Sequence, residues 1–181
     1  MAHPLFARLD QQLVLVKQEL AQAETSEALF RRLKKRGGSL YHEWSHNAAI
    51  ADGVHAIYTG IESIMEAIAN EIDDYAPRGD ASRADLVDSL SVAVKDVRPA
   101  VLGPATRELM HEVRRFRHVV RHKYALQLRR TDIARNFAAV RKLLPAFEHD
   151  YRAFAQSMSE EDRSHAGGQA RNGKGLRRKP R

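Results

Sequence analysis

Residues 40–74, LYHEWSHNAAIADGVHAIYTGIESIMEAIANEIDD, decide the fold of this chain. Apolar residues recur along this stretch every three or four positions, the spacing that puts side chains on one face of an α-helix. We therefore expect one long helix with one buried face. The predicted buried stripe consists of Tyr41, Trp44, Ala48, Ala51, Val54, Tyr58, Ile61, Met65, Ile68 and Ile72.

The same spacing continues on both sides of this helix, and no alternating apolar and polar run predicts a strand. The fold class we predict is therefore all-α, an antiparallel helical bundle of five to six helices. Pro145 should kink the last helix or mark its restart. The other helices are expected at about residues 5–20, at 26–36 with a stop at Gly37-Gly38, from Ser82, at 105–124 and from Thr131.

The net charge of +7 is located at the end of the chain. From Arg163 onward there are seven Lys or Arg and no acidic residue, whereas the remainder holds 23 basic and 23 acidic residues. Beyond Met158 almost nothing is apolar, which is typical of disorder. We predict a helical bundle over residues 1–158 and a basic, disordered tail over 159–181.

Composition excludes several classes of protein. The chain has no cysteine, which excludes disulfides, thiolate catalysis and cysteine-bound metal centres. Charged residues interrupt the first twenty positions, and no apolar stretch approaches the roughly 18–20 residues that span a bilayer. We expect a cytoplasmic protein without a membrane segment.

One motif, His42-Glu43-Trp44-Ser45-His46, fits the H-E-x-x-H pattern of zinc hydrolases, in which two histidines bind the metal and the glutamate activates water. The extended pattern fails because Ala49 stands where glycine is required. The alternative interpretation buries Trp44 on the helix stripe, with His42 and His46 beside it. Third metal ligands could be chosen from Glu62, Glu66 and Glu71.

A second motif, R-x4-H-x-Y, consists of Arg117, His122 and Tyr124. Each of the two motifs is expected by chance roughly 0.03 times in a chain of this composition. Chance frequency therefore does not indicate which motif is functional, and the surrounding residues must decide. Basic residues crowd the second motif and no acidic residue lies between Glu112 and Tyr124, so this surface attracts phosphate and repels a metal cation. The surrounding bases are Arg114, Arg115, His118, Arg121 and Lys123.

Residues 114–124, RRFRHVVRHKY, resemble the active-site helix of HEPN-fold ribonucleases, specifically the HepT-like toxins, and residues 51–62 are also similar to that family. The resemblance implies a homodimer whose two motifs line one cleft, and metal-independent RNA cleavage without a cofactor. It also implies a minimal-nucleotidyltransferase antitoxin that attaches AMP to Tyr124. One departure is His118, which stands where the family usually has Asn or Asp.

RNA carries its own nucleophile, the 2′-hydroxyl, so cleavage needs a base for that proton and a cation for the phosphate. We expect neutral His122 to be the base and Arg117 to hold phosphate oxygens. The supporting phosphate-binding residues would be His118, Arg121 and Arg114. Residues that could orient the arginines are Asp52, His55 and Glu62.

Arg117 and His122 are five residues apart, which on an ideal helix separates their directions by about 140°. Either the helix distorts near His122 or a second protomer completes the site, so the sequence favours a dimer. The alternative function from a different class is a non-catalytic HEPN-type module that binds nucleotide, RNA or protein through the same basic helix. A zinc hydrolase that uses His42, Glu43 and His46 is the other alternative.

Overall fold

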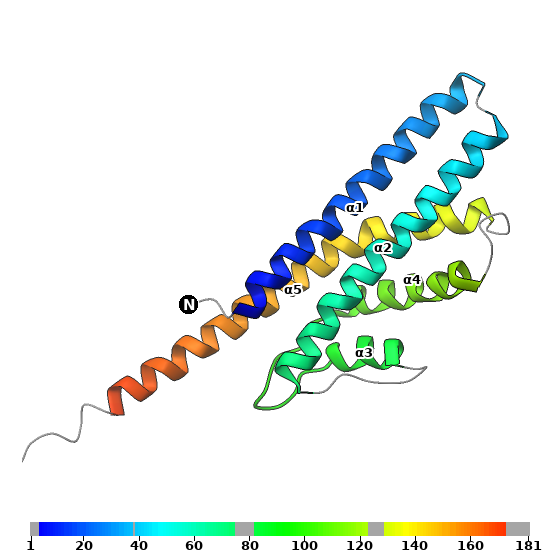
Figure 1. Ribbon diagram of the computed structural model, residues 1–181. Helices are drawn as coiled ribbons and strands as arrows, with labels where there is room; N and C mark the ends of the chain where they lie inside the picture. The colour runs from blue at the N-terminus through cyan, green and yellow to red at the C-terminus, as the bar shows by residue number, and fades with distance from the viewer. Residues whose placement is uncertain (1–3, 38, 75–81, 123–128, 173–181) are drawn as a thin grey trace, which may run out of the picture.

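The computed structural model describes residues 4–37, 39–74, 82–122 and 129–172, and their side chains except at 82, 117–122 and 161–172. The described chain is a bundle of helices (Figure 1), which confirms the all-α prediction. The helices are α1 Pro4–Lys35, α2 Leu40–Ile72, α3 Ser82–Leu90, α4 Pro104–His122 and α5 Arg130–Asn172.

The helix boundaries differ from the prediction at two places. The two short helices expected before Gly37 form the single helix α1, because residues 21–25 contain no glycine or proline and Ala23 is buried against α2. Of the two outcomes predicted for Pro145, a kink or a restart, the restart does not occur, because Pro145 lies inside α5 on an exposed position. α5 also continues to Asn172, past the predicted boundary at 158, and residues 173–181 lie outside the described residues.

α1 and α2 form an antiparallel pair in which close contacts repeat every seven residues along both helices. Val16 lies against Gly60, and Ala23 lies against Gly53. Seven residues further along, the Phe30 ring stacks on His46 with 4.1 Å between ring centroids. A β-carbon at Gly60 would overlap the Val16 side chain, so a glycine there allows the two helices to approach.

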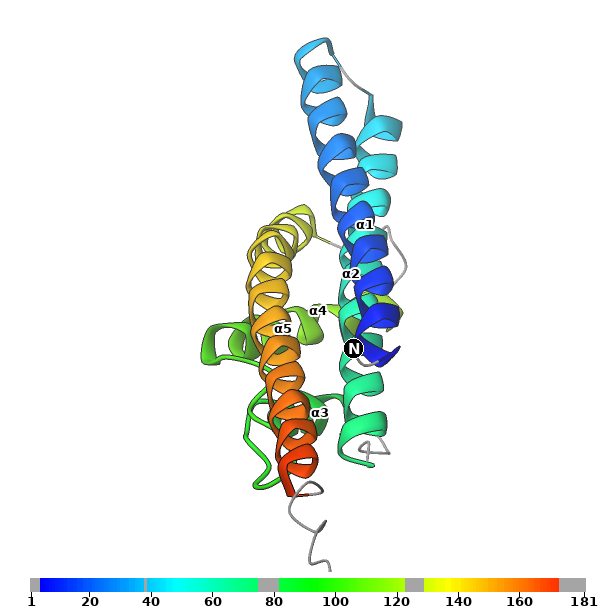
Figure 2. The ribbon, with the colours of Figure 1, turned by 90° about the vertical axis from the view of Figure 1, so that its left-hand side faces the viewer.

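α2 is the central helix of the bundle, and it packs against all four others. The predicted stripe is buried from Ala51 to Ile68, as at Val54, Tyr58, Ile61 and Met65, and Ile72 is partly buried. The prediction is wrong at the start of the helix, where Tyr41 is 69 % and Trp44 is 44 % exposed. Figures 1 and 2 show the first turns of α2 extending beyond α3 and α4, with α1 beside them. The start of α5 reaches them through Arg130, which pairs with Glu43, so these turns have fewer neighbouring helices than the rest of α2.

Two polar groups, one buried and one half-buried, fix where α4 begins. The Arg98 guanidinium is fully buried and donates to both carboxylate oxygens of Asp73, at 2.6 and 2.8 Å. The Asp150 carboxylate of α5 accepts hydrogen bonds from the Gly103 N–H at 2.8 Å and the Thr106 hydroxyl at 2.5 Å. Both interactions tie the segment that precedes α4 to other helices, so the direction of α4 is set at its N-terminus.

The Gly60 contact predicts an unusual response to a helix-favouring substitution. On an exposed helix Gly→Ala stabilises by about 1 kcal/mol, but Gly60→Ala should lower the free energy of unfolding by about 1–3 kcal/mol because the new methyl group overlaps Val16. Combining it with Val16→Ala should remove most of that loss, so the two effects should be non-additive in urea denaturation. Ser63→Ala, on the exposed face of α2, is the control. Additive effects in the double variant would contradict the proposed contact.

Candidate functional site

The helix that carries the R-x4-H motif packs on the core along one face. Met110, Val113 and Phe116 are buried, and their spacing of three residues is that of one face of a helix. The backbone of Arg117, His118, Arg121 and His122 belongs to the C-terminal part of α4, but the structure does not describe these side chains. Tyr124 lies outside the described residues.

The helical geometry of the motif bears on how Arg117 and His122 could meet. α4 is an uninterrupted α-helix from Pro104 to His122, so no distortion between the two residues reduces their separation of about 140° around the helix axis. A second copy of the chain is the other explanation that the sequence analysis offered, and we take it up in the proposed function below.

Arg114 lies one turn before the motif arginine and is half-buried. Its Nε is buried and has no hydrogen-bond acceptor among the described residues. A buried donor without an acceptor is unfavourable by about 1–3 kcal/mol, and such groups in native proteins call for an explanation. An anion bound near this guanidinium would supply one.

α2 places the three predicted orienting residues in different environments. Asp52 is exposed, His55 is half-buried and Glu62 is buried. The Glu62 carboxylate lies 2.8 Å from Nε of Arg83, which comes from α3. The structure thus brings Glu62 to an arginine that the sequence analysis did not select, because nothing in the pattern around residue 83 indicates that α3 crosses α2 at this point.

The residues of the H-E-x-x-H motif each have a structural partner. His42 Nδ1 accepts a hydrogen bond from the Ser39 N–H at 3.1 Å and so caps α2. Glu43 pairs with Arg130 of α5 at 2.8 Å. His46 Nε2 lies 2.9 Å from the Glu27 carboxylate, and its side chain is only 9 % exposed.

No metal site gathers around this motif in the part of the chain that the structure describes. There, no group of three or more His, Asp or Glu residues lies close enough to hold a metal ion. Of the carboxylates nominated as a third ligand, Glu62 pairs with Arg83 and Glu71 with Arg8. The zinc alternative therefore lacks a ligand set among the described residues.

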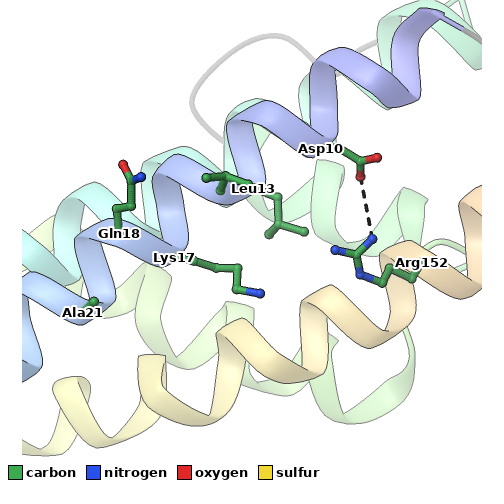
Figure 3. A pocket seen from close by; sticks show the side chains of 7 residues that line it. Asp10, Leu13, Lys17, Gln18, Ala21 and Arg152 are labelled. Atoms are coloured by element: carbon green, nitrogen blue, oxygen red, sulfur yellow. Dashed lines mark ion pairs between the residues drawn. The ribbon is translucent and has the colours of Figure 1, made fainter.

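Two of the cavities lined by described residues lie between α1 and other helices. One, of about 240 Å³, lies between α1 and α5, and Figure 3 shows Asp10, Lys17 and Arg152 at its edge. Its charged groups pair with one another or with Glu148, so they do not converge on a ligand. The other, of about 160 Å³, is lined by Glu27, Arg31, His46, Arg130 and Arg141 among others, and it lies where α5 begins.

One of three comparisons with known proteins gives a match. A family profile described as HepT-like protein matches residues 49–158, which is more than half of the chain and includes all of α4. Neither the curated proteins nor the solved structures give a significant match. Among the described residues, no helix has the length and apolar character needed to cross a membrane.

The environment of His46 predicts a pH-dependent contribution to stability. Burial lowers the pKa of His46 below its usual 6.5, against the opposing effect of Glu27, and nearby Arg130 and Arg31 lower it further. Because the unfolded chain then binds this proton more readily, the contribution is present above about pH 6.5 and is lost as the pH falls below it. His46→Phe keeps a ring to stack on Phe30 but cannot titrate. Its free energy of unfolding, from urea titrations at several pH values, should fall less on acidification than that of the wild type. Identical slopes for the two proteins would contradict the assignment.

Proposed function

This chain belongs to the HepT-like family of HEPN proteins, and from this we propose that it is a metal-independent endoribonuclease, the toxin of a toxin–antitoxin pair. The observation that carries the proposal is that the family match spans the R-x4-H-x-Y motif and the whole helix that presents it. The basic composition of residues 114–123 supports phosphate binding there.

The proposed reaction uses the RNA as its own nucleophile. His122 accepts the proton of the 2′-hydroxyl, and the 2′-oxygen attacks the adjacent phosphorus. The bond from phosphorus to the 5′-oxygen breaks, and that oxygen takes up a proton as it leaves. His122 gives up the proton that it accepted, so the net proton transfer is from the 2′-hydroxyl to the 5′-oxygen. The products are a 2′,3′-cyclic phosphate and a 5′-hydroxyl, so no water or metal ion enters the balance.

The arginines supply the positive charge that this reaction requires. Arg117 binds two phosphate oxygens through its planar guanidinium and stabilises the negative charge that develops at phosphorus. Arg114, Arg121 and His118 add to binding of the phosphate backbone. The buried Nε of Arg114, which has no acceptor among the described residues, supports this assignment.

We propose that the active form is a homodimer with the two motifs in one cleft. The support is geometric: α4 runs as a regular helix to His122, so Arg117 and His122 of one protomer face directions about 140° apart. In a dimer, Arg117 of one protomer and His122 of its partner can reach the same phosphate.

The proposed antitoxin is a minimal nucleotidyltransferase that transfers AMP from ATP to the Tyr124 hydroxyl and releases pyrophosphate. AMP at this position would add negative charge and bulk beside the arginines and so occupy the site for RNA phosphate. This part of the proposal rests on family membership and on the tyrosine two residues after His122.

Cleavage of RNA in excess EDTA tests the proposed reaction. The purified wild type should cut single-stranded RNA and leave cyclic phosphate ends, whereas His122→Ala should be roughly 10²–10⁴-fold slower because the base is lost. Arg117→Ala should be roughly 10²–10³-fold slower because a charge-stabilising donor is lost. His149→Ala changes an exposed histidine on α5 and is the control that should cleave at the wild-type rate.

Two results would contradict this proposal. An unmodified wild type that binds RNA but does not cut it would instead be a non-catalytic binding module. Activity that EDTA abolishes and zinc restores would favour the metal-dependent alternative.

The state of Tyr124 can be read from the mass of the intact protein. Co-expression with a nucleotidyltransferase encoded beside this chain should increase the mass by one AMP and abolish RNA cleavage. Tyr124→Phe should keep the unmodified mass and remain an active nuclease, because the hydroxyl that receives AMP is absent. A Tyr124→Phe protein that still gains AMP would place the modification at another residue.

A further inference from the structure

The turn between α1 and α2 forms a projection that the motif does not explain. Residues 28–37 and 39–47, which we call the hairpin tip, comprise the end of α1, the described residues next to it and the first two turns of α2. Both ribbon views show the tip extending beyond α3, α4 and α5 (Figures 1 and 2). The tip also precedes residues 49–158, the segment that matches the family.

The tip exposes large apolar side chains. Leu40 is 86 %, Tyr41 69 % and Trp44 44 % exposed. The Tyr41 and Trp44 rings are neighbours, with centroids 6.2 Å apart. Exposed aromatic side chains gathered in one place are typical of a binding surface.

The tip also carries cations without acidic partners. Arg32, Lys34, Lys35 and Arg36 are exposed, and within the described part of the chain none of them lies within 4 Å of a carboxylate. In contrast, Arg31 pairs with Glu27 and Arg130 with Glu43 at the base of the tip. The tip contains five Lys or Arg against one Glu, so its field attracts a polyanion.

Proteins bind single-stranded nucleic acid with two elements: exposed aromatic side chains that stack on the bases, and cations that contact the phosphates. The tip has both. We propose that the hairpin tip is a platform for single-stranded RNA, separate from the motif of α4. The choice of RNA as the polyanion rests on the proposed function.

The base of the tip connects this platform to the end of the bundle where α4 stops. Arg130, at the start of α5, pairs with Glu43 and lies over the Phe30 ring at 5.2 Å from its centroid. α4 ends and α5 begins on the side of the bundle from which the tip projects (Figure 1). A strand held at the tip can therefore continue over the basic start of α5 toward the motif.

Charge and shape favour RNA over the other occupants of such a surface. A second copy of the tip would bring together two surfaces of the same positive charge. Insertion into a membrane surface requires an apolar face along a helix, whereas the exposed apolar residues at the start of α2 are confined to its first two turns.

The test uses Trp44, which is the only tryptophan of the chain. In the His122→Ala protein, which leaves RNA intact, an unstructured oligouridylate should quench Trp44 fluorescence, and added salt should reverse the effect. Two variants should each bind labelled oligouridylate roughly 5- to 100-fold more weakly. One is Tyr41→Ala, and the other changes Arg32, Lys34, Lys35 and Arg36 together to Gln. Matched controls on the α3–α4 connection, Val92→Ala with Val97→Ala and separately Lys95→Gln, should leave the affinity unchanged.

Several results would overturn the platform. The first is a Trp44 emission that RNA does not change, together with wild-type RNA affinity in the tip variants. The second is a Trp44 emission that responds to phosphatidylserine vesicles but not to RNA. The third is a Trp44 emission that depends only on protein concentration. The last two would assign the tip to a membrane or to a second copy. If the wild type does not cleave RNA but RNA still quenches Trp44, the platform stands and the proposed nuclease fails. If the wild type cleaves but the tip variants bind RNA normally, only the platform fails.

Discussion

The close approach of α1 and α2 is the constraint on which the rest of this structure depends. The contacts Val16–Gly60, Ala23–Gly53 and Phe30–His46 follow one another at intervals of seven residues on both helices. This repeat is close to two helical turns, so one face of each helix meets the other along most of its length. With α1 held on this face, the remaining faces of α2 are free to bury their apolar residues against α3, α4 and α5.

The same pairing has opposite consequences at the two ends of the hairpin. Where α2 is covered on several sides, Tyr58, Ile61 and Ile64 are completely buried. At the other end α2 has only α1 and the start of α5 beside it. Apolar residues of similar size therefore remain exposed there, and four exposed cations of the tip have no carboxylate partner among the described residues. The stable core and the proposed RNA platform are therefore two parts of one helical hairpin, and they differ in what packs beside them.

Packing also distinguishes the two sequence motifs, whereas their expected chance frequencies are the same. His42, Glu43 and His46 are occupied by a helix cap, an ion pair to α5 and a stack on Phe30. These contacts use the side chains that a metal site would need. The R-x4-H motif instead lies at the far end of a helix whose start is fixed by Asp150 and whose apolar face is buried, an arrangement that suits a basic helix end presented to a phosphate.

The sequence by itself determined the all-α class, the extent of α2 and the inward face of α4, because these follow from apolar spacing within a single helix. It also contained the motif and the resemblance to the family. Tertiary structure decided the rest: that α1 continues through residues 21–25, that Glu62 meets Arg83, and that Tyr41 and Trp44 are exposed. The physical reason is that helical periodicity indicates which face is apolar, whereas burial of that face at a given turn depends on whether a neighbouring helix reaches that far.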